Sequence, residues 1–487
     1  MNVDFSSVSN KHKISIASFT DDQKKAYNDL IDFINKPFSE TDFKRALVGP
    51  AGTGKTYLVK ALIENSSIVY SNIGLSAPTH KACRVLQEAV GINYIKVNTL
   101  QSDLGLRLNC DLEKFDYKHP NFDPRGKIKI GLYKIYMIDE ASMINRGLLK
   151  FIERICIQNG CKIIYIGDDS QLAPVGETSA LAFSGVKTNK LTQVVRQGDD
   201  NPISELLELL RYDIKHKTFK FLEFISVNKY KFNSDNTKGF QVVNSRQFSD
   251  IVLNNFNDKE YTKNIELSKV IAYTNVQVNN WNNFIRHNII KDSDISVLTK
   301  NDLITSYVTI VNVFNEAVIK NSEDYIVNDI VNYVHPKLNL KGFMVKFTAI
   351  HGGRITKPLF IVDHTDSFTM QMYVKIANSL IDSAKSATAT TRVTKWREYF
   401  NFKNSCLLLT NIVNSSGKIV FNRDLDYGFA LTAHKSQGST FSTALVDVND
   451  ICYDKYGVPY RNCEEMNRRL YVACSRAKDK LFLKYGL

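Results

Sequence analysis

The residues best suited to chemistry lie in the run Gly49-Pro50-Ala51-Gly52-Thr53-Gly54-Lys55-Thr56, which has the spacing of a phosphate-binding loop. Glycines let backbone N–H groups turn toward phosphate oxygens, and the N-terminus of a following helix adds a positive end. Lys55 would place its charge on the β- and γ-phosphates of ATP, and Thr56 would offer its hydroxyl to Mg²⁺. A glycine-rich turn that matches by chance is the alternative. The strand expected at 45–48 and the helix expected at 57–65 favour the phosphate loop.

Two further polar segments each follow an apolar strand. Asp139 and Glu140 come after the strand expected at 134–138, and two adjacent carboxylates there are hard to explain by packing. We expect Asp139 to hold Mg²⁺ through water and Glu140 to polarise the attacking water. Gln171 comes after the strand expected at 161–166 and would reach the γ-phosphate. An exposed strand end and an ordinary turn are the alternatives for these two segments.

Segments of strand and helix character alternate around these residues, which predicts parallel sheets with helices on both faces. The alternation is interrupted at 104–131, which is charged and aromatic and contains prolines, and again at 291–420. We interpret both stretches as insertions. The expected layout is therefore two α/β units, each with an insertion.

Two RecA-like units in one chain suggest that the nucleotide binds between them. The second unit must then supply arginines that stabilise the charge of the transition state. Arg196 and Arg476 are the candidates, and a solvated surface charge is the alternative for each.

Composition limits the partners and the compartment. The 487-residue chain has a net charge of +13 and a pI of about 9.1, which favours a polyanionic partner, although a basic soluble protein is the alternative. The eight cysteines lack zinc-site spacing and are interpreted as reduced thiols. No apolar run is long enough for a membrane span, so we expect no membrane partner and a cytoplasmic protein.

In order along the chain, these motifs resemble those of superfamily-one DNA helicases of the 5′→3′ branch, the RecD-like and phage Dda-like enzymes. The resemblance covers 20–290 and 421–487, and 291–420 matches only loosely. It is carried by GPAGTGKT at 49–56, APTHKA at 77–82, IDEASM at 138–143, GDDSQLAPV at 167–175, LTQVVRQ at 191–197, AYTN at 272–275, LTAHKSQGSTF at 431–441 and YVACSRA at 471–477.

The resemblance assigns roles by position. Gln23 would read the edge of adenine, and Gln437 and Gly438 would lie near the nucleotide. Contacts to the DNA strand would come from Pro78, Thr79, His80, Thr99, Asn275, Thr432, His434 and Lys435. Two departures stand out: Gln101 occupies a position where the family often has His, and no Tyr precedes Arg196 to stack on adenine.

The resemblance also implies roles for residues of the two insertions. Phe115 or Tyr117 would stack on a base at the fork as a strand-separating pin, and packing within a hairpin is the alternative. Trp396, Glu398, Tyr399 and Phe400 resemble a segment that braces the pin, with core packing as the alternative. The predicted boundaries are 1–103 and 131–190 for the first RecA-like P-loop NTPase domain, 104–130 for its pin insertion, 191–290 and 421–487 for the second RecA-like domain, and 291–420 for a small β-barrel-like insertion with a helical extension.

The function implied is that of an ATP-dependent DNA helicase that uses ATP and Mg²⁺. Expected partners are single-stranded DNA and fork DNA, together with a single-stranded DNA-binding protein or replisome components. We expect a monomer, in the host cytoplasm if a phage encodes it, that acts in replication or recombination. The rival functions are a translocase that displaces proteins from single-stranded DNA without unwinding, an RNA helicase, and a non-enzymatic DNA-binding subunit. The presence of every predicted catalytic residue argues against the last.

Overall fold

The computed structural model describes residues 14–106, 126–193 and 201–486, apart from positions 175, 178, 260, 262, 263, 265, 266, 292, 294, 295, 313 and 315. Contacts divide the chain into two compact units. Unit 1 comprises Met1–Lys220 and Asn462–Ser475, and unit 2 comprises Phe221–Arg461 and Arg476–Leu487. Within the described ranges, every helix is too short or too polar to cross a bilayer.

Unit 1 is built on a sheet whose six strands all pair in parallel, in the order β3-β2-β4-β5-β1-β6. The strands are β1 (Lys44–Val48), β2 (Ile73–Ala77), β3 (Val97–Thr99), β4 (Ile135–Ile138), β5 (Lys162–Gly167) and β6 (Thr188–Lys190). Because side chains alternate along a strand, the strands β1, β4 and β5 contribute to two cores. Leu47 of β1 belongs to one core, and its neighbours Ala46 and Val48 belong to the other.

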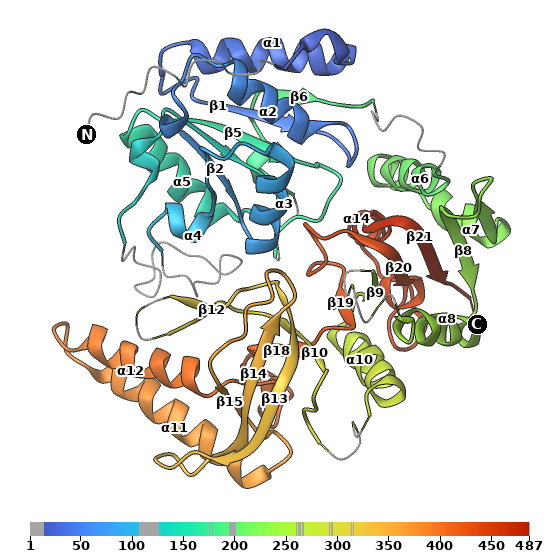
Figure 1. Cartoon of the computed structure of the whole chain (residues 1–487). Coiled ribbons are helices and arrows are strands. Elements are labelled where there is room, and N and C mark those ends of the chain that lie inside the picture. The colour runs from blue at the N-terminus through green and yellow to red at the C-terminus, as the bar shows by residue number, and fades with distance from the viewer. Residues whose placement is uncertain are drawn as a thin grey trace. The chain divides into compact units, whose positions relative to one another are not determined.

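Helices cover both faces of this sheet (Figure 1). The first core contains side chains of α1 (Asp21–Asn35), α2 (Lys55–Asn65) and α3 (His80–Val90), and the second contains those of α4 (Leu100–Asp103) and α5 (Arg146–Gln158). Unit 1 also includes α6 (Ile203–His216) and α14 (Cys463–Cys474), and short 3-10 turns at Ile16–Ser18, Tyr70–Asn72, Ile130–Leu132, Ala141–Met143 and Leu181–Phe183.

Unit 2 contains a second sheet of the same type, in the order β19-β9-β20-β21-β8-β7. Its pairings are parallel except between β7 and β8. The strands are β7 (Tyr230–Phe232), β8 (Gly239–Val243), β9 (Ser268–Ala272), β19 (Ala430–Thr432), β20 (Phe441–Asp447) and β21 (Ala477–Lys484). The helices are α7 (Lys220–Val227), α8 (Ser245–Phe256), α10 (Asn275–Ile289) and α13 (Val448–Cys452). Phe248 of α8 and Trp281 of α10 pack with Val270 of β9 in one core.

An antiparallel layer lies between β9 and β19 in the sequence. Its five-stranded sheet has the order β15-β14-β13-β10-β18, from β10 (Leu303–Ser306), β13 (Asp324–Val334), β14 (Lys341–Ala349), β15 (Leu359–Val362) and β18 (Leu425–Tyr427). Two short ladders pair β11 (Ile310–Val311) with β12 (Ala317–Ile319) and β16 (Ile412–Val413) with β17 (Ile419–Phe421). The helices α11 (Ser367–Ser386) and α12 (Arg392–Ser405), orange in Figure 1, lie side by side, and Tyr373 and Phe402 pack with Phe360 of the sheet.

The predicted fold class is confirmed: parallel α/β sheets of RecA type, with additional sheet in the second half. The predicted domain boundaries stay a prediction. On α12 the rings of Trp396, Tyr399 and Phe400 lie 5.3 to 6.1 Å apart. Their bracing role stays a prediction as well, since the proposed pin residues Phe115 and Tyr117 lie outside the described residues.

Candidate nucleotide and nucleic-acid sites

The glycine loop joins β1 to α2, and at two of its positions a residue other than glycine would clash or be strained. A Cβ atom at Gly49 would lie 2.6 Å from the carbonyl oxygen of Leu191. Gly54 is the N-cap of α2 with φ 80°, in the left-handed region, and it offers no side chain to cap the helix. The first turn of α2 also contains no acidic residue. Its N–H groups therefore form an anion site of the kind that binds phosphate.

The loop is braced from within and from α1. Lys55 Nζ donates to the carbonyl oxygens of Gly49 at 2.5 Å and Pro50 at 2.9 Å. Gln23 Nε2 donates to the carbonyl oxygen of Thr53 at 2.9 Å, and Gln23 Oε1 accepts from the backbone N–H of Thr20 at 3.0 Å. Both ends of the Gln23 amide therefore fix the start of α1 against the loop. Its predicted contact with adenine stays a prediction.

The three predicted nucleotide segments meet at one edge of the unit 1 sheet. The strands β4, β5 and β1 are neighbours and run parallel, so their carboxyl ends share that edge. Gly49 N–H donates to the carbonyl oxygen of Gly167 at 3.1 Å, which joins the phosphate loop to the loop after β5. Lys55 at the start of α2, and Asp139 and Gln171 in the loops after β4 and β5, thus all lie at the carboxyl edge, where ligands bind in open α/β sheets.

The acidic pair after β4 has features of a reactive site. Burial raises the pKa of Asp139, and the charge of Lys55 opposes this shift. One carboxylate oxygen of Asp139 accepts from Glu140 N–H at 2.9 Å. Glu140 has φ 51°, a left-handed conformation that is uncommon for a residue other than glycine and that concentrates at functional sites.

The chemistry of these donors fits Mg²⁺. The second carboxylate oxygen of Asp139 makes no hydrogen bond to any residue that the structure describes. Together with the Thr56 hydroxyl it provides the oxygen ligands that Mg²⁺ prefers. Groups of three or more metal-ligating side chains are absent from the described residues.

The loop after β5 is held by α14, which the sequence analysis did not single out for this role. Tyr471 donates its hydroxyl to the Asp168 carboxylate at 2.7 Å. Arg468 Nη1 donates to the carbonyl oxygens of Asp169 at 2.6 Å and Gln171 at 3.0 Å. Arg468 and Tyr471 are three residues apart and so lie on one face of the helix. That spacing is the only sequence signal for the pair.

The predicted strand contacts of unit 1 follow β2 and β3, which continue the sheet beyond β4. Pro78, Thr79 and His80 come directly after β2, and Thr99 ends β3. Each threonine caps a helix: Thr79 Oγ1 accepts from Ala82 N–H at 3.2 Å, and Thr99 Oγ1 from Ser102 N–H at 3.4 Å. A hydroxyl that accepts in this way keeps its own proton to donate. Gln101, which departs from the family pattern, is buried.

In unit 2 the predicted residues fall into two groups. Ser439, next to Gly438 and Gln437, accepts from Arg476 Nη1 at 3.0 Å through its carbonyl oxygen, so the nucleotide-side candidates lie together. On the other side, Thr432 Oγ1 accepts from Lys435 N–H at 3.1 Å, with His434 between them in the chain. Asn275 begins α10, after a strand that pairs with β19. Arg196 lies outside the described residues.

The parallel sheet, the glycine loop at the N-terminus of α2 and the carboxylates at the same edge define a P-loop NTPase of RecA type. The family model described as an AAA domain matches residues 20–224. The ATP-dependent DNA helicase dda of Enterobacteria phage T4 is 27% identical over 288 residues, which cover 57% of this chain and 59% of that protein. The ATP-dependent RecD2 DNA helicase of Deinococcus radiodurans is 31% identical over 159 residues, 32% of this chain and 20% of that protein.

A third relative extends the similarity to nearly the whole chain. The protein R530 of Acanthamoeba polyphaga mimivirus, described as uncharacterized, is 25% identical over 527 residues, which cover 95% of this chain and 99% of that protein. With the ordered motifs, these similarities confirm the predicted resemblance. In sequence the chain is similar to ATP-dependent DNA helicases of the Dda-like and RecD-like group.

Proposed function

We propose that the chain hydrolyses ATP to move 5′→3′ along single-stranded DNA and to separate the duplex ahead of it. One observation carries this proposal. On the unit 1 sheet, the nucleotide loops after β4, β5 and β1 are flanked by the candidate strand contacts after β2 and β3, along a single edge. A change in the nucleotide can therefore reach the DNA strand through adjacent loops of one rigid sheet. Replication or recombination would be the setting.

The chemistry at the nucleotide would rest on positioning and charge. Lys55 would bind the β- and γ-phosphates, and Thr56 and Asp139 would hold Mg²⁺, which supplies charge neutralisation of the phosphates when bound. Glu140 would accept the proton of the attacking water. Gln171 would detect the γ-phosphate from a loop that Arg468 and Tyr471 hold in place. Arg196 and Arg476 would stabilise the transition state.

Recognition of the strand would be nearly independent of base sequence. The candidate contacts are hydroxyls, amides, a lysine and backbone N–H groups, which bind phosphate and sugar rather than base edges. The net charge of +13 supports binding to a polyanion. Affinity for DNA should therefore fall steeply as salt rises.

The decisive experiment is strand displacement on matched duplexes with a 5′ tail, a 3′ tail or blunt ends, with ATP and Mg²⁺. We expect displacement of the 5′-tailed duplex only, and none with a non-hydrolysable ATP analogue. Faster displacement from the 3′ tail would overturn the polarity. ATP turnover stimulated by single-stranded DNA without any displacement would favour the translocase, and stronger stimulation by RNA of the same sequence would favour an RNA helicase.

A further inference from the structure

A cluster of polar side chains in unit 2 joins two of the candidate strand contacts that are far apart in the sequence. Arg423, which precedes β18, donates to Asn275 Oδ1 from Nη2 at 3.0 Å. The same nitrogen donates to the hydroxyl of Tyr307 at 3.0 Å. The Tyr307 ring has the guanidinium of Arg423 at 4.4 Å and the ammonium of Lys435 at 4.6 Å from its centre. Asn275 and Lys435 are therefore linked through Tyr307 and Arg423, which we call the Arg423 node.

The node is a rigid, buried support. Only 5% of the Arg423 surface is exposed. Its guanidinium also forms an ion pair with Asp426 at 2.6 Å and donates to Asn279 Oδ1 at 3.0 Å. Because these bonds hold its guanidinium in place, Arg423 is not suited to move onto a ligand. It can instead fix the orientation of the groups around it.

The orientation of the Asn275 amide follows from this support. Arginine can only donate hydrogen bonds, so the atom that faces Arg423 must be the amide oxygen. The amide nitrogen of Asn275 makes no hydrogen bond to any residue the structure describes, and Asn275 is exposed. Its two N–H donors are thus presented to the exterior. Lys435, half-buried and held by the Tyr307 ring and by Asn321 Oδ1 at 2.8 Å, brings a positive charge to the same cluster.

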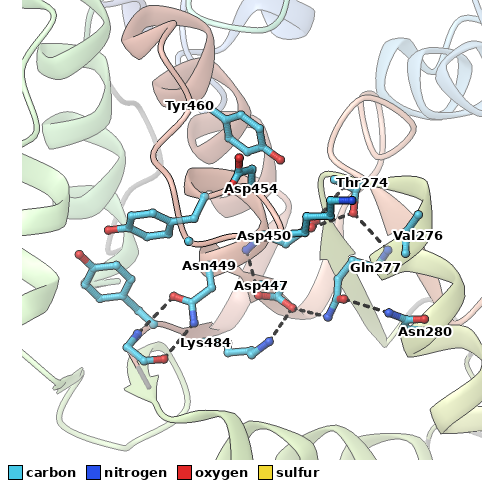
Figure 2. Close-up of a pocket in the computed structure, with 15 residues that line it drawn as sticks. Thr274, Val276, Gln277, Asn280, Asp447, Asn449, Asp450, Asp454, Tyr460 and Lys484 are labelled. Atoms are coloured by element: carbon cyan, nitrogen blue, oxygen red, sulfur yellow. Dashed lines mark hydrogen bonds and ion pairs between the residues drawn. The ribbon is translucent and has the colours of Figure 1, made fainter.

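The opposite flank of the α10 N-terminus is unsuited to phosphate. A cavity of about 920 Å³ lies there. Asp447 and Asp450 are among the residues that line it (Figure 2). Asp450 Oδ2 already accepts from the N–H groups of Tyr273 and Thr274, at 2.7 and 2.8 Å. A carboxylate therefore occupies the anion position on that side, and a polyanion would be repelled. Of the two flanks, the one at the Arg423 node is suited to a phosphodiester.

We propose that Arg423 and Tyr307 are positioning residues that hold the amide donors of Asn275 and the ammonium of Lys435 on the phosphates of the bound DNA strand. The proposal rests on the proposed function and assigns residues of the inserted layer to strand binding. Because the groups that the node would turn toward the strand are the amide donors of Asn275 and the ammonium of Lys435, it would bind the backbone and not read bases.

The first test changes the direction of hydrogen bonding at Asn275. In Asn275→Asp the carboxylate keeps its bond to Arg423 but can no longer donate to a phosphate. We expect unchanged thermal stability, a KM for a single-stranded oligonucleotide in the ATPase assay raised about tenfold, and a kcat within twofold of wild type. Asn280→Asp, an equal charge change on the same helix but on the cavity side, should leave that KM nearly unchanged. Equal effects of the two variants would overturn the proposal.

The second test measures whether Tyr307 acts through Lys435. Lys435→Ala should make the negative slope of log affinity against log salt less steep by about 0.7. That change corresponds to the loss of one phosphate contact on a single strand. Tyr307→Leu should reduce the steepness of this slope by a similar amount, and Tyr307→Phe should reduce it by less. The double variant Tyr307→Leu/Lys435→Ala should reduce it by no more than either single change. Additive effects, or an unchanged slope in Tyr307→Leu, would contradict the node. Wild-type protein that fails to bind single-stranded DNA would instead contradict the proposed function.

Discussion

The two parallel sheets each present a helix N-terminus at the carboxyl end of a strand, but they use it differently. After β1, the cap of α2 is Gly54, no side chain or acid covers the first turn, and Lys55 follows. After β9, the cap of α10 is Thr274, whose hydroxyl accepts from Gln277 N–H, and the carboxylate of Asp450 binds the N–H groups of Tyr273 and Thr274. The fold provides the same positive helix end twice. At α10 the anion is a carboxylate of the chain itself, whereas the N-terminus of α2 is left open to an anionic ligand.

The largest effect is expected when the positive charge of Lys55 is removed from the N-terminus of α2. Lys55→Ala should lower the rate of ATP hydrolysis by about 100-fold or more, because a preorganised donor to the phosphates is lost. Binding of single-stranded DNA should stay close to wild type in a fluorescence anisotropy assay. Lys60→Ala, the same charge change further along α2, is the matched control and should keep full activity. Robust hydrolysis in Lys55→Ala would contradict the assignment of the phosphate loop.

At the other helix end, Asp450→Asn should destabilise the protein without affecting chemistry. One carboxylate oxygen becomes an NH₂ donor that faces groups which themselves donate, so we expect a loss of about 2 kcal/mol in the free energy of unfolding. Urea denaturation of the full chain measures it, with kcat for ATP as a second readout. Asp250→Asn, an exposed site on α8, serves as the control. A stable Asp450→Asn variant with impaired hydrolysis would show that the two ends are not functionally distinct.

The smallest effect on stability is expected from the cap itself. Gly54→Ala places a Cβ at φ 80°, which should cost about 1 kcal/mol in the free energy of unfolding. The strained loop should also bind ATP more weakly, measured by titration with a fluorescent ATP analogue. Thr274→Gly at the corresponding position of α10 has no need of a left-handed backbone and should leave ATP affinity unchanged. Equal ATP affinity of Gly54→Ala and wild type would show that ATP binding does not depend on a glycine at the cap of α2.

Local sequence patterns were sufficient for the parts of the molecule that depend on neighbours in the chain. The phosphate loop and the acids after β4 each follow an apolar strand, and strand polarity alone brings them to one edge. The strands expected at 45–48, 134–138 and 161–166 are β1, β4 and β5, and each end differs by at most one residue. The match was less detailed in the insertion at 291–420, whose expected helical extension is two helices, α11 and α12.

The positioning residues could not be found in this way. Arg468 binds backbone carbonyl oxygens of a loop about 300 residues earlier. Because every residue has a backbone carbonyl group, no residue type marks such an acceptor in the sequence. Tyr307 and Arg423 meet Asn275 and Lys435 only because the inserted layer folds against the parallel sheet of unit 2. Their side chains carry no motif, since their task is to orient other residues.

The threonine caps of unit 1 have a consequence for local unfolding. The hydroxyls of Thr79 and Thr99 each hold the first turn of a helix and, in the proposed function, would also donate to the strand. Fraying of either helix end would therefore release its grip on DNA, and a bound strand would suppress the fraying. Amide hydrogen exchange in the first turns of α3 and α4 would then follow the occupancy of the strand, so these two helix ends would act as built-in reporters of the motor's position in its cycle.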